Sequence, residues 1–129
     1  MQPDKILEDF ESALAQLEAA LQEPADSDLI KAGCIQYFEF CFELAWKTVK
    51  IVAADLGLEC RSPKACLKTA FQQEWIDEGG HLLAMLAARN RMSHTYDAQN
   101  ALSVYSRLPE FLPPMKRLLW NLKSVGQQR

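Results

Sequence analysis

Apolar side chains recur at steps of three and four along most of the chain, which is the period of one face of an α-helix. The first such stretch covers residues 3 to 22, with Pro3 at its start and Pro24 just beyond its end. The second runs from about residue 27 to Leu56 and is followed by Gly57, a residue type common at helix ends. No stretch alternates apolar and polar residues between turn residues, so we predict an all-α fold.

Three further helical regions are predicted in the second half of the chain. Ser62 followed by Pro63 is a typical helix start, because serine caps free backbone N–H groups and proline has none to leave unpaired. The buried face of this third helix is predicted to contain Cys66, Leu67, Ala70, Phe71 and Trp75. The Gly79–Gly80 pair precedes a fourth helix, and a last helical region begins after Asp97. Its prolines should kink or interrupt it (Pro109, Pro113 and Pro114).

A chain of 129 residues with no break in composition has room for one hydrophobic core. We therefore predict a single helical domain over residues 1–129, built as an up-down bundle of four or five helices. Residues 1–25 lack the basic head and uninterrupted apolar run of a signal peptide, and no apolar stretch is long enough for a membrane span. These features predict a cytoplasmic protein without a membrane segment.

The cysteines and histidines do not indicate a metal centre. Four cysteines are present at positions 34, 41, 60 and 66, and no pair has the spacing of metal ligands. The absence of an export signal favours a reducing compartment, so free thiols are expected for all four. Cys34 and Cys41 lie on one helical face and fit buried apolar positions. We predict no metal and no cofactor.

The second helix carries two apolar stripes rather than one. Phe38 and Ala45 belong to the first stripe, whereas Phe42 and Trp46 belong to the second. A helix with two apolar faces needs a neighbour on each. The chain's own helices could surround it, as in a bundle, or a second copy of the chain could cover one face. The pattern leaves both arrangements open and is a first indication of a homodimer.

Acidic residues lie between those stripes. Glu39 and Glu43 are like charges four residues apart, an unfavourable pair unless a cation lies nearby. They either face solvent or orient Arg89 or Arg91 from a neighbouring helix.

Polar side chains crowd the end of the fourth helix: Arg89, Asn90, Arg91, Ser93, His94 and Tyr96. An imidazole can exchange a proton near neutral pH, and a guanidinium binds phosphoryl oxygens through a planar fork. Metal-free RNA cleavage needs both groups. Alternatively, these residues only complement the negative end of the helix and its free carbonyls. The spacing alone does not choose between the two interpretations.

Helical geometry restricts the catalytic interpretation. On a regular helix Arg89 and His94 diverge by about 140°. Their convergence on one substrate requires a bend near Ser93, or two copies of the segment facing each other across a dimer. One histidine per chain would supply both an acid and a base only if two chains each present one.

The same residues resemble a known family. Arg89, His94 and Tyr96 match the Arg-x4-His-x-Tyr signature of HEPN domains, with Asn90 as the polar residue usual after that arginine. Two longer blocks, Ile35–Phe40 with Glu43, Leu44 and Lys47, and Ser93–Asp97, resemble the branch called nucleotidyltransferase substrate-binding proteins. Together with the helix order, the resemblance covers nearly the whole chain.

The resemblance implies a helical-bundle homodimer encoded beside a minimal nucleotidyltransferase, in a two-component module of which many examples are toxin–antitoxin systems. The toxin members cut RNA at the dimer interface without a metal ion, and the nucleotidyltransferase silences them by adding AMP to the motif tyrosine. By this resemblance, Arg89 stabilises phosphate, Asn90 assists, His94 is the acid or base, and Tyr96 is modified. The supporting residues would be Arg91, Ser93, Glu39 and Glu43.

A second function is compatible with the same motif. The net charge of −3 argues against nonspecific binding of nucleic acid over the whole surface, but it allows a local site. The chain has no Gly-Ser followed by paired aspartates, so any nucleotidyl transfer would need a partner chain. The alternative to a ribonuclease is therefore a non-catalytic subunit that binds a substrate or nucleotide for that partner.

Overall fold

The computed structural model describes residues 3–76, 79–94 and 101–127, and these ranges contain helices and connections without strands. The all-α prediction is confirmed. The elements in chain order are α1 (Pro3–Leu21), α2 (Asp28–Asp55), α3 (Pro63–Gln72), α4 (Gly79–His94), the 3-10 helix η1 (Ser103–Arg107) and α6 (Leu108–Gln127).

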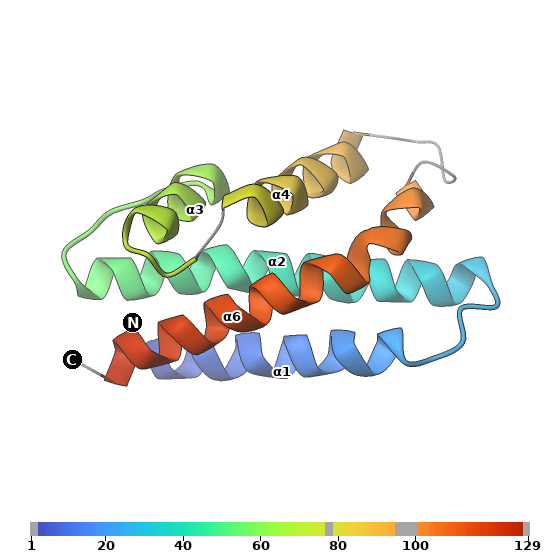
Figure 1. Cartoon of the computed structure of the whole chain (residues 1–129), viewed down its shortest axis with the longest axis horizontal. Helices are drawn as coiled ribbons and strands as arrows, with labels where there is room; N and C mark the ends of the chain where they lie inside the picture. The colour runs from blue at the N-terminus through green and yellow to red at the C-terminus, as the bar shows by residue number, and fades with distance from the viewer. Residues whose placement is uncertain (1–2, 77–78, 95–100, 128–129) are drawn as a thin grey trace.

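The long helix α2 is the centre of the bundle (Figure 1). It packs against α1, α3 and α6, while α4 packs against α3 and α6. In the view of Figure 1, α1 lies along one side of α2, α3 and α4 lie along the other, and α6 runs obliquely across α2 towards α1. Helix α2 therefore lies between α1 and α4 (Figure 1).

The ends of α2 follow from local hydrogen bonds. The Ser27 side chain accepts a hydrogen bond from the Ile30 backbone N–H at 3.2 Å. At the other end Gly57 has a positive φ of 80°, which lets the Leu58 N–H reach the Ala53 carbonyl at 2.8 Å. Both predicted ends are confirmed.

Helix α3 starts as predicted and ends in a way that was not predicted. The Ser62 side chain accepts from the Ala65 N–H at 3.1 Å, with Pro63 as the first helical residue. After the helix, Glu74 has a φ of 62°, and the Trp75 N–H donates to the Ala70 carbonyl at 2.8 Å. The same reversal that uses glycine after α2 therefore uses a glutamate here. Phe71, near the end of α3, is 51% exposed, so its predicted burial is wrong.

The C-terminal helical region is interrupted just before Pro109, whereas the predicted interruption at Pro113 and Pro114 is wrong. The 3-10 helix η1 precedes α6, which then continues through Pro113 and Pro114 without a break. Pro109 lies in the first turn, where its missing N–H removes no helical hydrogen bond. Phe111 and Met115 are both fully buried, so the turns on both sides of the two prolines pack into the same core. The stretch that follows Asp97 up to residue 100 lies outside the described residues.

The two apolar stripes of α2 are covered mainly by the chain's own helices. Phe38 and Phe42, one from each stripe, are both fully buried. The Phe38 ring stacks on Phe111 of α6 with 5.5 Å between centroids. Trp46 is the half-exposed member of its stripe. The bundle therefore accounts for most of this pattern without a second copy.

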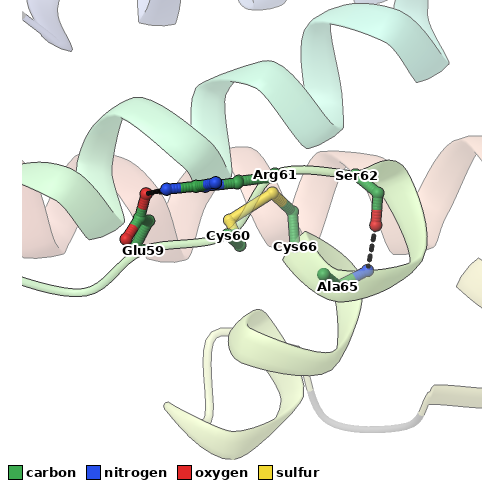
Figure 2. The surroundings of a disulfide bond; sticks show 6 residues. All are labelled: Glu59, Cys60, Arg61, Ser62, Ala65 and Cys66. Atoms are coloured by element: carbon green, nitrogen blue, oxygen red, sulfur yellow. Dashed lines mark hydrogen bonds and ion pairs between the residues drawn. A yellow bond between two sulfur atoms is a disulfide. The ribbon is translucent and has the colours of Figure 1, made fainter.

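The expectation of four free thiols is wrong for two of the cysteines. Cys60 and Cys66 form a disulfide with their Cα atoms 5.1 Å apart. Figure 2 shows it between the connection that follows α2 and the first turn of α3, next to the ion pair of Glu59 and Arg61. The reversal at Gly57 and the helix start at Ser62 bring the two residues together, and this local geometry overrides an argument based on compartment. Cys34 and Cys41 are free and buried, as predicted.

None of the helices described is long and apolar enough to cross a membrane.

Candidate functional site

Helix α4 presents the arginine of the motif at the edge of the core. Met85 and Ala88 are buried on the face of α4 that packs inward. Arg89 follows this buried face and keeps 32% of its side chain exposed. Its guanidinium is therefore partly desolvated but still reachable from outside.

The Arg89 guanidinium is bound by a carboxylate of the central helix. Nη2 of Arg89 lies 2.7 Å from Oε1 of Glu43, whose side chain is 34% exposed. This contact joins α4 to α2 across 46 positions of sequence. The sequence left two interpretations of Glu39 and Glu43: exposure to solvent, or contact with an arginine. For Glu43 the structure shows contact with an arginine. Within the described residues Glu39 has no ion pair, and Arg91 is exposed without one.

The second oxygen of Glu43 is also engaged. Oε2 accepts a hydrogen bond from the Trp46 indole N–H at 3.1 Å and lies 3.7 Å from the Lys47 ammonium. The Lys47 ammonium is in turn 5.8 Å from the centre of the Trp46 ring. Because both oxygens have partners on rigid helices, the carboxylate is held in one orientation, and this orientation fixes Arg89.

Asn90 is the neighbour of Arg89 on its other side. Nη1 of Arg89 donates to Oδ1 of Asn90 at 3.3 Å. The structure therefore brings together three of the predicted residues, Arg89, Asn90 and Glu43. A positive group that is held by a carboxylate and an amide can be aimed at an anionic phosphoryl group without losing much freedom on binding.

The rest of the motif is only partly described. Helix α4 continues without a break through Ser93 and ends at His94, so the expected bend at Ser93 does not interrupt it. The side chains of Ser93 and His94, and the whole of Tyr96, lie outside the described residues. Up to His94 the backbone keeps the helical divergence between Arg89 and His94. The arrangement in which two chains each contribute part of the site stays a prediction.

A groove of about 390 Å³ lies between α1 and α2. It is lined by Asp9, Ser12, Ala13 and Gln16 of α1 and by Phe40, Glu43, Leu44 and Lys47 of α2. Glu43 therefore belongs both to this groove and to the ion pair with Arg89. The groove was not predicted from the sequence. Phe40 is the residue that could have indicated it, because this aromatic side chain belongs to neither apolar stripe of α2.

No metal site is apparent in the part of the chain that the structure describes: it holds no group of three or more His, Cys, Asp or Glu side chains placed to bind an ion.

Comparisons with known proteins place these features in context. The profile of the family described as nucleotidyltransferase substrate binding protein like matches residues 5–124. A protein of Haemophilus influenzae named probable ribonuclease HepT is 32% identical over 114 residues, which cover 83% of this chain and 77% of that protein.

Two solved structures share the fold. A Thermus thermophilus protein superimposes with a TM-score of 0.79 at 30% identity, covering 88% of this chain and 98% of that one. The protein HI0074 of H. influenzae, described as having the fold of a substrate binding domain of a nucleotidyltransferase, gives a TM-score of 0.78 at 28% identity, covering 91% and 98%.

Proposed function

The chain belongs to the family of nucleotidyltransferase substrate-binding-like proteins, and on that premise we propose that it is the HEPN subunit of a two-component module with a minimal nucleotidyltransferase. In this proposal it acts in the cytoplasm as a metal-independent endoribonuclease. A homodimer presents two copies of the segment from Arg89 to Tyr96 to one RNA strand. The name of the H. influenzae relative, a probable ribonuclease, supports this activity.

The observation that carries the proposal is the contact between Arg89 and Glu43. A surface arginine with no function would gain little from a carboxylate held by a tryptophan and a lysine, because exposed ion pairs contribute little stability. Here the pair is about two-thirds buried, and Arg89 lies five residues before the only histidine of the motif. Such an arrangement suits a guanidinium that must meet a phosphate in one orientation.

The proposed chemistry needs only the side chains of the motif. One His94 removes the proton of the ribose 2′-hydroxyl, whose oxygen then attacks the adjacent phosphorus. The His94 of the second chain gives a proton to the departing 5′-oxygen, so that a 2′,3′-cyclic phosphate and a 5′-hydroxyl are formed. Arg89, assisted by Asn90, stabilises the negative charge of the pentacoordinate phosphorane. Arg91 and Ser93 would contact the RNA backbone nearby.

Tyr96 is the proposed point of control. The partner nucleotidyltransferase would transfer AMP from ATP to the Tyr96 phenol, with formation of a phosphoester bond and release of pyrophosphate. An added nucleotide two residues from His94 would place a bulky anion at the site of the RNA phosphate. The modification would therefore block cleavage by both charge and volume.

An RNA cleavage assay in the presence of a chelator tests the activity. We expect His94→Ala to abolish cleavage, and Arg89→Ala to reduce it by about 10²-fold or more, as for the loss of one transition-state donor. Two matched controls are available: His81→Ala on the first turn of α4 and Arg117→Ala on α6 remove the same residue types far from the motif. Unchanged cleavage by His94→Ala would disprove the assignment.

A second candidate function is a non-catalytic subunit that binds a substrate or nucleotide for the nucleotidyltransferase. The description of HI0074, a structural neighbour, as a substrate binding domain favours this candidate. Calorimetric titration of the protein with ATP and with the nucleotidyltransferase encoded by the adjacent gene separates the two. Binding without any RNA cleavage would support the second candidate, and the absence of binding to either would remove it.

A further inference from the structure

The groove between α1 and α2 contains an aromatic ring that the core does not use. Phe40 is 48% exposed and lines the groove, although the neighbouring Phe38 and Phe42 are fully buried. Tyr37, one turn earlier, is 36% exposed and meets the Phe40 ring edge-on, with 6.4 Å between centroids. This contact steadies the Phe40 ring while leaving much of it accessible.

We infer that this groove is a nucleobase site, in which a base of single-stranded RNA stacks on Phe40 while the adjacent phosphate lies at Arg89. The inference rests on the proposed function and deepens it, because it assigns the binding of the substrate to residues outside the Arg-x4-His-x-Tyr motif. Bases of single-stranded RNA are commonly bound by stacking on aromatic side chains, with polar groups at their edges.

The size and lining of the groove fit such a ligand. Its volume of about 390 Å³ is near the lower end of the range of small-molecule sites. Helix α2 supplies the flat apolar ring, and α1 supplies the Ser12 hydroxyl and the Gln16 amide opposite it. These two groups can donate to or accept from the hydrogen-bonding edge of a base. A purely apolar partner would leave them unsatisfied.

Glu43 connects the groove to the proposed catalytic group. It lines the groove, and its Oε1 accepts from Nη2 of Arg89 at 2.7 Å. One side chain therefore separates the place proposed for a base from the place proposed for a phosphate, as in a nucleotide, where one sugar separates the two. The Glu43 contact would then fix the base site and the phosphate site relative to each other.

The charges around the groove are compatible with a polyanion. The two carboxylates of the lining are both paired, Asp9 with Lys5 at 2.8 Å and Glu43 with Arg89. The Lys47 side chain, which also lines the groove, is 53% exposed, and its ammonium can approach a phosphate. An exposed lysine beside an uncharged ring, with both carboxylates of the lining paired, favours an anionic strand with stacked bases over an acidic or apolar protein segment.

The test uses the full chain and short single-stranded RNAs that each carry one 2-aminopurine, whose fluorescence is quenched on stacking. The variants are Phe40→Ala, Phe40→Trp and the matched control Phe71→Ala, which removes a phenylalanine of similar exposure, 51%, from α3. We expect Phe40→Ala to weaken binding by about 5- to 150-fold and to abolish the quenching. Phe40→Trp should retain both signals, and Phe71→Ala should match the wild type.

The outcomes separate this inference from the proposed function. If the wild type cleaves RNA but Phe40→Ala and Phe71→Ala bind equally well, the base site is wrong and the ribonuclease proposal stands. If light scattering shows that Phe40→Ala dissociates a wild-type dimer, Phe40 belongs to a protein interface and the base site is again wrong. If the wild type neither binds nor cleaves RNA, both proposals fail.

Discussion

Two faces of α2 use the same kind of side chain in opposite ways. Phe38 and Phe42 point into the bundle and are fully buried, whereas Phe40, which lies between them in sequence, lines an open groove. The inner face also holds Cys41, and burial raises the pKa of its thiol to about 12. The outer face holds Glu43 with its three partners, Arg89, Trp46 and Lys47.

The two faces differ in how much they contribute to the free energy of folding. Burying a phenylalanine removes a large apolar area from water and contributes several kcal/mol to folding. The ion pair of Arg89 and Glu43, whose side chains are about one-third exposed, contributes at most about 1 kcal/mol, because solvent still screens it. The inner face therefore carries the stability of the bundle, and changes on the outer face should affect binding and chemistry while leaving the fold intact.

The largest expected effect is on the inner face. Phe42→Ala should lower the free energy of unfolding by about 3–5 kcal/mol, because it leaves a cavity at the centre of the core. Phe40→Ala should change it by less than about 0.5 kcal/mol. Urea titration followed by circular dichroism measures both. Equal losses for the two variants would contradict the separation of the faces.

The second-largest expected effect on stability concerns the connection that follows α2. Reduction of the disulfide between Cys60 and Cys66 should lower the free energy of unfolding by about 2 kcal/mol, as a short closed loop is released in the unfolded chain. Urea titration with and without a phosphine reductant measures this loss. The double variant Cys60→Ser with Cys66→Ser should show no response to the reductant. RNA binding should not change, since the disulfide lies on neither face.

The two helix ends with positive φ should respond in opposite directions. Gly57→Ala should cost about 1 kcal/mol, because a Cβ is strained at a φ of 80°. Glu74→Gly should stabilise the protein by a similar amount, because it relieves that strain at a φ of 62°. Thermal unfolding of the two variants provides the measurement. A loss of stability in Glu74→Gly would mean that the glutamate side chain has a role of its own.

The ion pair of the outer face should have a small effect on stability and a large one on activity. Glu43→Gln should change the free energy of unfolding by less than about 1 kcal/mol. RNA cleavage should fall, with kcat reduced more than KM is raised, because Arg89 loses the partner that orients it. A double-mutant cycle with Arg89→Ala checks that both changes act through one contact. Additive effects on cleavage would place Glu43 outside the mechanism.

The smallest effect at neutral pH concerns the Cys41 thiol. Its pKa is raised from an ordinary 9.0 to about 12 by burial, so the unfolded chain loses this proton at a lower pH than the folded one. Stability should therefore be unaffected below pH 9 and should fall as the pH rises from about 9 towards 12. Cys41→Ala should reduce this alkaline loss. An identical pH profile in that variant would show that Cys41 is not its cause.

The helices could be predicted closely because their signals are local. The cap at Ser62 and the reversal at Gly57 each depend on residues within a few positions, and each was found where the sequence indicated. The left-handed turn at Glu74 was missed because its residue type does not favour that conformation. The disulfide was missed because it depends on two turns acting together.

The candidate site, too, could be predicted only in part from the sequence. The motif from Arg89 to Tyr96 can be read directly from the sequence, and so can its divergence on a regular helix. The contact with Glu43 was one of two alternatives, because nothing local tells which helix faces α4. The groove was missed although Phe40 stands out from both apolar stripes, since its two walls come from helices whose relative placement is decided by packing.

The sequence by itself determined where the helices begin and end, that they bury one core, and which segment carries imidazole and guanidinium together. Periodicity and capping act over a few residues, so no knowledge of the fold is needed to find them. Only the tertiary structure decided that Glu43 holds Arg89, that Cys60 pairs with Cys66, and that Phe40 faces a groove. These contacts depend on how the core orients whole helices against one another, and that orientation is the result of packing all the side chains at once.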